Sequence, residues 1–381
     1  GDICQNVAVP NKIIYNPDDM DGVLYNIFFP VDMLESDADK NEALEQLAFQ
    51  LMPLETNMTD TSVFFLNEGR KILTAAMITY YHQGMDFPQI CKKIISSSWS
   101  TLFSEIDQNG NYEAKQYINS FEGTNEKNIA GCKQACDSAL KLFATNSHVY
   151  NAIGREREGK EAFTPEQLEN KNIFILIQDS KLELYEPLVH IITAQCMEYF
   201  SNRDNNNQHT ILMCLDEFAS FGHLEITPAL RKLRKKHVRI MVLTQSLADI
   251  DLIYGRDERM AMLNNFAYKI VLGCSDSDTQ EYFSRLIGEK EVYRKAVSKN
   301  GKQVTNTKTE VKERIVPPAE LARLGRHMIL LAEGKYYKLT KNYYFELDFW
   351  DRVKKCINNL SRIQEEDFSE KNTLSLTDEN K

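Results

Sequence analysis

Residues 210–217 read Thr-Ile-Leu-Met-Cys-Leu-Asp-Glu, and this stretch decides how the rest of the chain is interpreted. Five consecutive apolar residues predict a buried strand, and two carboxylates follow this strand without a spacer. A carboxylate beside a protein core needs a cation, a proton or a hydrogen-bond donor to compensate its charge. Asp216 and Glu217 therefore suggest a chemical role, although they could also be two solvated acids in the turn after a core strand.

A second apolar strand follows after a predicted helix at 228–236. It spans residues 240–243 and ends at Thr244-Gln245. In a parallel α/β sheet, ligands bind in the crevice outside the carboxyl ends of the strands. We therefore expect Asp216, Glu217 and Gln245 to project to one edge of the sheet. A strand that ends in Asp-Glu is typical of the Walker B motif, in which the Asp holds Mg²⁺ and the Glu polarises the attacking water.

Two longer segments carry a specific resemblance. Residues 215–225 read LDEFASFGHLE and residues 230–255 read LRKLRKKHVRIMVLTQSLADIDLIYG. Both resemble the type IV secretion coupling proteins, the TraG/TraD-like conjugative DNA-transfer ATPases. The resemblance implies an α/β fold with a RecA-like P-loop NTPase core, a mostly parallel sheet flanked by helices. It also implies an all-α subdomain inserted into that core.

The family assigns roles to four residues of this sequence. By similarity, Asp216 holds Mg²⁺ through water, Glu217 is the catalytic carboxylate, and Gln245 senses the terminal phosphate of ATP. Arg234 stands where the family carries an arginine that reaches into a neighbouring subunit's site. The implied cofactors are ATP and Mg²⁺, and the implied assembly is a homo-hexamer.

Four ranges describe the expected organisation of the 381 residues. The expected parts are an N-terminal part of the nucleotide-binding domain at 1–59, an all-α insert at 60–165, the main RecA-like part at 166–350, and a short helix with a disordered tail at 351–381. The first βαβ unit is expected to be incomplete. Within these parts, the sequence predicts strands at 172–177 and 268–273, a helix opened by Pro187, and a hairpin at Asn300-Gly301.

The net charge of −10 argues against a protein coated with nucleic-acid-binding surface, so DNA contact would follow a local basic path. Lys295, Lys299 and Lys302 near the predicted hairpin are candidates for contact with a DNA backbone. They could equally be ordinary charged positions on solvated strands.

The eight cysteines include no C-x-x-C pair, which indicates a reducing cytosol and no structural zinc. Cys196, Cys214 and Cys274 lie in apolar segments, where a thiol behaves as a small core residue. No apolar run is long enough to span a membrane. Because coupling proteins carry N-terminal membrane helices, we expect a soluble cytoplasmic portion whose missing N-terminal segment tethers it to the cytoplasmic face of the cell membrane.

A phosphate-binding loop is not evident in the sequence. Residues 154–161 read GREREGKE and match G-x-x-x-x-G-K, but Glu161 occupies the position of the Mg²⁺-binding hydroxyl and no strand is expected before the match. We therefore reject this match and expect the 381 residues alone to be inactive in ATP hydrolysis.

Two functions remain open. The first is the motor of a type IV secretion or conjugation system, which transfers single-stranded DNA with its attached relaxase into the secretion channel. The second is a non-hydrolysing remnant that acts as a DNA- or relaxosome-binding module.

Overall fold

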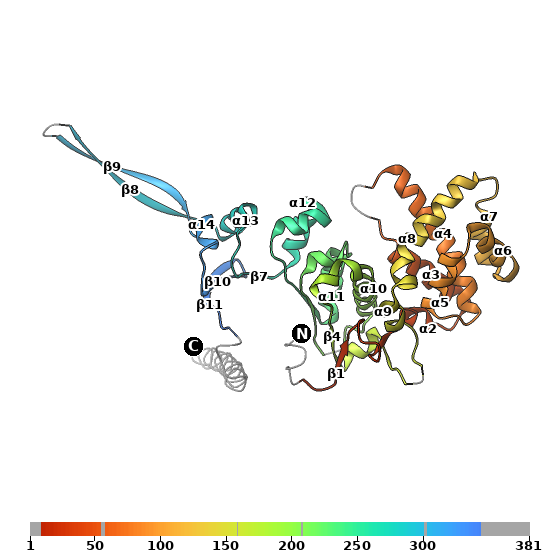
Figure 1. The fold of residues 1–381 in the computed structure, drawn as a ribbon. Coiled ribbons are helices and arrows are strands. Elements are labelled where there is room, and N and C mark those ends of the chain that lie inside the picture. The colour runs from red at the N-terminus through yellow and green to blue at the C-terminus, as the bar shows by residue number, and fades with distance from the viewer. Residues whose placement is uncertain (1–8, 55–57, 158, 207–208, 301–302, 344–381) are drawn as a thin grey trace, which may run out of the picture. The chain divides into compact units, whose positions relative to one another are not determined.

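The computed structural model describes residues 9–54, 58–157, 159–206, 209–300 and 303–343, with the backbone alone for 295–300 and 303–308. The chain divides into two compact units, 1–266 and 267–381, and each is described by itself (Figure 1). This division into two units does not follow the predicted domain boundaries. The predicted domains at 1–59, 60–165 and 166–350 therefore stay predictions. The predicted tail at 351–381 lies outside the described residues. None of the described helices has the length and apolar character needed to cross a bilayer.

Three parallel strand pairs form the sheet structure of the first unit. They are β1 (Lys12–Tyr15) with β4 (Asn172–Ile175), β2 (Leu24–Tyr25) with β3 (Ala162–Phe163), and β5 (Ile211–Leu215) with β6 (Val238–Val242). The predicted strands before Asp216 and Gln245 are therefore present and parallel. Among the described residues the three pairs are separate, where the sequence predicted one mostly parallel sheet.

Helices occupy the stretch from 60 to 152. The predicted all-α range of 60–165 also contains the short strand β3 at its end, so that range is not helical throughout. The first unit begins its helical part with α2 (Phe29–Asp32) and α3 (Asp37–Leu51), followed by α4 (Asp60–His82), α5 (Phe87–Ser96), α6 (Trp99–Asn109), α7 (Tyr112–Asn119), α8 (Glu126–Thr145) and α9 (Ser147–Ala152). Side-chain caps explain where several of them begin. Ser36 accepts a hydrogen bond from the backbone N–H of Asp39, and Asp86 and Gln89 form a capping box at the start of α5.

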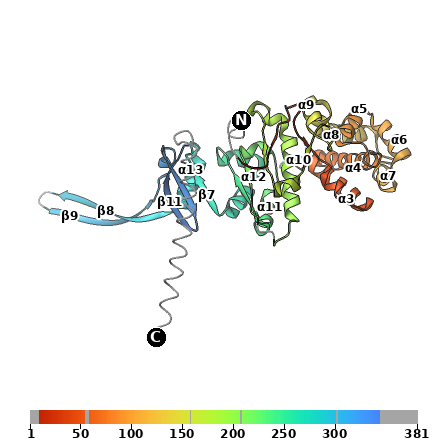
Figure 2. The same cartoon turned by 90° about the horizontal axis from the view of Figure 1, so that it is seen from below.

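Helix α10 (Leu182–Ser201) lies between the helices α2–α9 and α11 (Ile226–Leu233) in both views (Figures 1 and 2). The sequence predicted that Pro187 opens this helix, and this was wrong, because the helix begins five residues earlier and Pro187 lies inside it. Tertiary contacts explain the difference. Tyr185 is buried and its hydroxyl donates to Asp18 Oδ1 at 2.7 Å, which holds the first turn in place.

A buried aromatic cluster connects the strands β1, β2 and β3 to α10. The ring centroids of Tyr15 and Tyr25 lie 5.1 Å and 5.0 Å from that of Phe163. The Tyr25 hydroxyl donates to Gln195 Oε1 at 2.6 Å, and Gln195 Nε2 donates to the carbonyl of Ile27 at 2.9 Å. Both polar groups of Gln195 are thus satisfied inside the core, which fixes α10 against the N-terminal segment.

The strand β5 is exposed on one face, so the prediction of a buried strand was only half correct. Leu212 is 61% exposed and Met241 on β6 is 42% exposed, while Ile211 and Leu215 are buried. Cys214 is also exposed, contrary to the prediction that it is a core residue. Within the first unit no described element covers this face, whereas a parallel sheet normally has both faces covered.

The second unit contains an antiparallel sheet and a long ribbon. Its elements are β7 (Tyr268–Val271), α13 (Ser277–Ile287), β8 (Glu289–Asn300), β9 (Gln303–Arg314), α14 (Pro318–Leu321), β10 (His327–Ala332) and β11 (Lys335–Thr340). Strand β10 pairs antiparallel with both β7 and β11. The β8–β9 ribbon is antiparallel with Asn300 opposite Gln303, which confirms the two arms of the predicted hairpin (Figure 1). Asn300 lies in β8, and residues 301–302 lie outside the described residues.

Arg155 joins the end of the helical part to the N-terminal segment. Its guanidinium donates to Asp32 through Nε at 3.0 Å and through Nη2 at 2.7 Å. It also lies 5.2 Å from the ring centroid of Phe28 and 5.0 Å from that of Tyr81. The backbone N–H of Arg155 donates to Asp86 Oδ2 at 3.0 Å. The Arg155 side chain thus connects the segment after α9 to α2 through Asp32 and to α4 through Tyr81.

The Arg155–Asp32 pair makes stability depend on pH. Burial acts to raise the pKa of Asp32, but hydrogen bonds from Arg155, Asn26 and Tyr81 outweigh it and hold the pKa below the ordinary 3.8. The stabilisation is therefore fully present above pH 3.8 and is lost as the pH falls through the lowered pKa.

Replacement of Arg155 tests this connection. Arg155→Ala is expected to lower the free energy of unfolding by about 1–2 kcal/mol, because Asp32 loses a charged partner and two rings lose a cation, at a site that water partly screens. Urea denaturation measures the loss, and the difference from wild type should shrink below pH 3.8. The matched control is Arg157→Ala at an exposed position, expected within ~0.5 kcal/mol of wild type. Equal effects of the two variants would contradict the assignment.

Candidate functional site

The carboxyl ends of β5 and β6 lie side by side. The N–H of Leu243 donates to the carbonyl of Leu215 at 3.0 Å, which extends the parallel pairing by one residue. Gln245 Nε2 donates to Glu217 Oε1 at 3.1 Å and to Oε2 at 3.3 Å. Asp216, Glu217 and Gln245 are all exposed. The structure therefore brings these three predicted site residues together at one open edge.

Glu217 has an unusual backbone conformation. Its φ of 49° and ψ of 49° lie in the left-handed region, which a side chain with a Cβ rarely adopts. The N–H of Glu217 donates to Asp216 Oδ1 at 3.1 Å, and its carbonyl accepts from the N–H of Ser220 at 2.7 Å. These bonds turn the chain sharply after β5, and backbone strain of this kind concentrates at functional sites. The sequence carried no signal for it.

Tyr254 holds the loop that follows the acidic pair. It belongs to α12 (Leu247–Asn265), and its ring stacks on Phe218 with centroids 5.6 Å apart. The Tyr254 hydroxyl donates to the carbonyl of Gly222 at 3.3 Å and accepts from the N–H of Leu224 at 3.0 Å. Sequence reasoning missed this residue, because neither its spacing nor its neighbours indicate a contact with the loop.

Two histidines also contact the loop. His190 on α10 is buried, and its Nδ1 donates to the carbonyl of Phe221 at 3.3 Å. Burial lowers the pKa of His190, which favours the neutral ring. His223 Nε2 lies 3.2 Å from Glu258 Oε2 on α12. The loop 218–225 is thus fixed to both neighbouring helices.

Arg203 organises the opposite end of the two strands. Its buried guanidinium donates to Glu169 through Nε and Nη2, both at 2.6 Å, in a bidentate pair. Its Nη1 donates to the carbonyls of His209 and Lys236, both at 2.8 Å. Since His209 precedes β5 and Lys236 precedes β6, Arg203 aligns the starts of both strands. No sequence motif indicated this role.

Arg234 is not brought to the acidic pair. It follows α11, is exposed, and begins a 3-10 helix at 234–236 that leads into β6. Gln245 follows β6, so the two residues lie at opposite ends of a five-residue strand. At about 3.3 Å per residue, the strand separates them by roughly 16 Å. Within one chain Arg234 therefore lies away from Asp216.

The predicted DNA-binding lysines fall outside what the structure describes in side-chain detail. In the backbone register of the ribbon, Lys295 pairs with Lys308 and Lys299 pairs with Val304. Lys302 is outside the described residues. Their contact with DNA stays a prediction.

The carboxylates suit a nucleotide-borne Mg²⁺ better than a metal site built by the protein alone. Among the residues that the structure describes, no group of three or more His, Cys, Asp or Glu side chains could hold a metal ion. Mg²⁺ usually takes one or two carboxylates and completes its coordination with water and substrate phosphates. The exposed Asp216 carboxylate, beside Glu217, fits that mode of binding.

The rejected phosphate-loop match does not form an anion cradle. The N–H of Arg157 donates to the carbonyl of Lys160 at 3.2 Å, and the reverse bond is 2.8 Å, so the stretch is a tight turn that leads into β3. The Asp86 carboxylate already accepts from the N–H of Arg155. A carboxylate at this position would repel a phosphate, which supports the rejection.

Comparison with protein families gives a match over nearly the whole chain. The family model for "Type IV secretory system Conjugative DNA transfer" matches residues 8–371. The chain belongs to this family. It is a type IV secretion coupling protein by family, as the two motif segments indicated.

Relatives of known name agree with this assignment. The chain is 20% identical over 306 residues to Protein VirD4 of Agrobacterium fabrum, covering 77% of this chain and 45% of that protein. It is 22% identical over 234 residues to Protein VirD4 of Rhizobium radiobacter, covering 59% of this chain and 33% of that protein. The chain thus spans less than half the length of these curated relatives.

Solved structures show the fold. The bacterial conjugative coupling protein TrwBdeltaN70 superposes with a TM-score of 0.71 at 21% identity, covering 90% of this chain and 76% of that one. TrwB with a non-hydrolysable ATP analogue gives a TM-score of 0.69 at 21% identity, covering 90% and 77%. TrwB has also been solved with ADP and Mg²⁺. The fold of this chain is therefore that of the TrwB coupling protein.

Removal of one hydroxyl tests how the loop is held. Tyr254→Phe is expected to keep the stacked ring but lose the hydrogen bonds to Gly222 and Leu224, since phenylalanine has no hydroxyl. Amide hydrogen exchange at Leu224 should accelerate by about tenfold, because each lost bond contributes roughly 1 kcal/mol. The control is Tyr112→Phe at a residue that is 76% exposed, which should leave exchange unchanged. Unaltered exchange in Tyr254→Phe would remove Tyr254 from this role.

Proposed function

We propose that this chain is the catalytic part of a coupling-protein motor that uses ATP to transfer single-stranded DNA and its attached relaxase into a type IV secretion channel. The observation that carries the proposal is the contact between Gln245 and Glu217 at the carboxyl ends of β5 and β6, beside Asp216. This edge is where ligands bind in α/β folds. Family membership and the nucleotide complexes of the similar TrwB structures support the same reading.

Each residue of the edge has a distinct task in this proposal. MgATP, when bound, supplies the scissile phosphoanhydride bond and the cation that neutralises developing charge. Asp216 orients the cation through water. Glu217 accepts a proton from the attacking water, and Gln245 orients the Glu217 carboxylate and reports the presence of the terminal phosphate. The left-handed turn at Glu217 and the anchored loop keep these groups in position.

The proposed hydrolysis requires a phosphate-binding loop, and no stretch of the 381 residues matches G-x-x-x-x-G-K followed by Ser or Thr. The chain alone is expected to hydrolyse ATP no faster than background. The absence of such a loop also keeps the second candidate in view, a non-hydrolysing module that binds DNA or relaxosome proteins. The two candidates differ in one measurable property, because only the motor loses function when Glu217 is replaced.

Arg234 is proposed to act in a neighbouring subunit of a homo-hexamer. Its exposure and its place at the far end of β6 favour a role outside its own site. The wider proposal follows the family: a RecA-like core over 1–59 and 166–350, an all-α insert over 60–165, a membrane tether through a further N-terminal segment, and secretion-channel components as partners. Lys295, Lys299 and Lys302 of the ribbon are proposed to follow the DNA backbone.

Glu217→Gln tests the proposed chemistry in a protein that carries a phosphate-binding loop together with these residues. Nucleotide affinity should stay within about threefold, while turnover falls by roughly 10²–10⁴, because the amide cannot accept the proton of water. The measurements are nucleotide binding by fluorescence and steady-state ATPase rate. Glu225→Gln, a nearby exposed carboxylate beyond the strand end, is the control and should retain turnover. Unchanged turnover in Glu217→Gln would contradict the proposed motor.

Arg234→Ala tests the shared site. The variant alone should lose about 10³-fold or more in ATPase rate, since a trans arginine contributes that much in such hydrolases. Mixed oligomers of Arg234→Ala and Glu217→Gln subunits should regain activity, because some interfaces then combine an intact arginine with an intact carboxylate. Lys235→Ala is the control for charge loss at the adjacent exposed position. Absence of rescue would argue for an ordinary surface arginine.

A further inference from the structure

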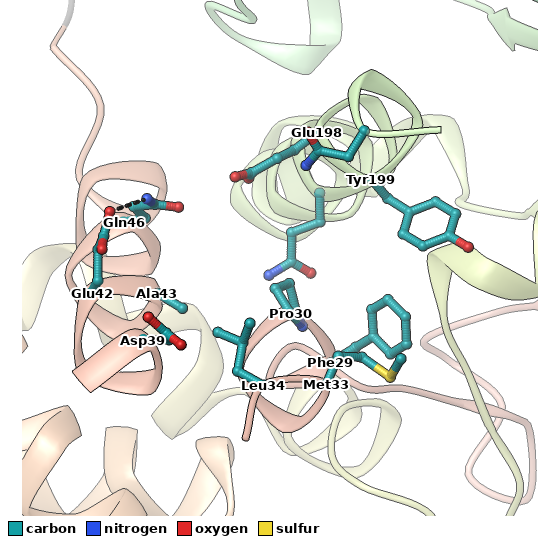
Figure 3. A pocket seen from close by; sticks show the side chains of 12 residues that line it. Phe29, Pro30, Met33, Leu34, Asp39, Glu42, Ala43, Gln46, Glu198 and Tyr199 are labelled. Carbon is teal, nitrogen blue, oxygen red and sulfur yellow. Dashed lines mark hydrogen bonds between the residues drawn. The ribbon is translucent and has the colours of Figure 1, made fainter. Parts of the chain in front are cut away.

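An open groove lies between α2, α3 and α10 of the first unit. None of the residues that line it belongs to the β5–β6 edge, where Asp216, Glu217 and Gln245 lie. The cavity of the groove has a volume of about 410 Å³. Figure 3 shows side chains from residues 29–34 and from α3 facing Glu198 and Tyr199 on α10 across this space. All of these elements lie outside the predicted insert at 60–165. By these predicted ranges the groove belongs to the proposed nucleotide-binding part.

The floor of the groove is apolar and aromatic. Phe29 is 7% exposed, and its ring centroid lies 5.9 Å from that of Tyr199. Leu34 and Ala43 are half-buried at the wall, and Met33 is 60% exposed at the opening. An apolar side chain that entered here would be removed from water on several sides.

The rim carries carboxylates without cationic partners. Asp39 accepts from the Ser36 hydroxyl at 2.6 Å, and Glu198 accepts from Gln50 Nε2 at 2.6 Å. Glu42 accepts from Gln46 Nε2 at 3.5 Å (Figure 3). Within the described part of the chain, none of these three carboxylates forms an ion pair. Neutral donors thus satisfy their hydrogen bonding but leave three negative charges around an apolar hollow.

The walls of the groove are held in place before any ligand arrives. Gln50 on α3 is bonded to Glu198 on α10, and Gln195 on α10 is bonded to the carbonyl of Ile27 beside α2. Both bonds join elements far apart in sequence. When a binding site is already ordered, binding costs less conformational entropy, so a larger share of the contact energy contributes to affinity.

We propose that this groove binds a peptide segment of a partner protein in which an apolar side chain is flanked by lysine or arginine. The apolar floor selects the central side chain, and the carboxylates on two facing helices select cations on both sides of it. The same charges would repel nucleic acid and anionic lipid surfaces. The proposal does not depend on ATP hydrolysis, since none of its residues belongs to the β5–β6 edge.

A selection experiment tests the proposal without assuming one peptide sequence. A random dodecapeptide phage library is selected on the immobilised 381-residue chain. Enrichment of peptides with an apolar residue between lysines or arginines is expected. Enriched peptides are then synthesised with a fluorescent label, and their affinity is measured by anisotropy at two salt concentrations. Affinity should fall with added salt, because charge pairs at an exposed rim are screened.

Two variants and one control locate the binding. Ala43→Trp fills the hollow, and Glu42→Lys inverts one rim charge at an exposed position that tolerates substitution. Each should weaken the selected peptide by about tenfold or more, a loss typical of a central contact in an interface. Glu122→Lys makes the same charge change at an exposed position outside the groove and should stay within about twofold. Circular dichroism checks that each variant is folded.

Some outcomes would overturn the proposal. The first is a selection that enriches no peptides with an apolar residue between basic residues. The second is a selected peptide that binds Glu42→Lys as tightly as it binds wild type. The third is a loss of peptide affinity in Glu122→Lys as large as that in Glu42→Lys. A selection dominated by acidic peptides would point to a different surface and would equally reject the groove.

Discussion

The buried guanidinium of Arg203 is the constraint on which the functional edge depends. Its four hydrogen bonds connect Glu169 to the carbonyls of His209 and Lys236, so the starts of β5 and β6 are held level. A parallel pair aligned at its start is also aligned at its end, since both strands rise equally per residue. The meeting of Glu217 with Gln245 therefore follows from an interaction at the opposite end of the strands. Removing one partner of the buried Arg203–Glu169 ion pair would be costly, so the pair is well suited to fix the register of β5 against β6.

The site combines rigid and open features. The loop after Asp216 is fixed by Tyr254 and His190, and the backbone of Glu217 is held in a strained conformation. The carboxylates themselves remain exposed, and within the first unit no described element covers Leu212 on one face of β5. The edge therefore presents positioned acids in an open setting.

Two long-range contacts hold segments of the first unit together. Arg155 and Gln195 each connect segments more than a hundred residues apart, one at the surface of the first unit and one in its core. Because α10 takes part in the core contact and also forms a wall of the acidic groove, the groove and the N-terminal strands share one supporting helix. A ligand in the groove would contact the same helix that carries His190. The two surfaces are therefore linked by one rigid element.

The sequence by itself determined the strand before Asp216, the parallel strand before Gln245, most of the helices after residue 60 and the two arms of the ribbon after Gly288, because apolar periodicity and turn residues are local signals. The family motifs also indicated which side chains meet at the edge. Only the tertiary structure decided the roles of Arg203 and Tyr254, the early start of α10, and the exposed face of β5. These features depend on contacts between residues distant in sequence, and no local pattern specifies which distant partner a buried arginine or tyrosine will find.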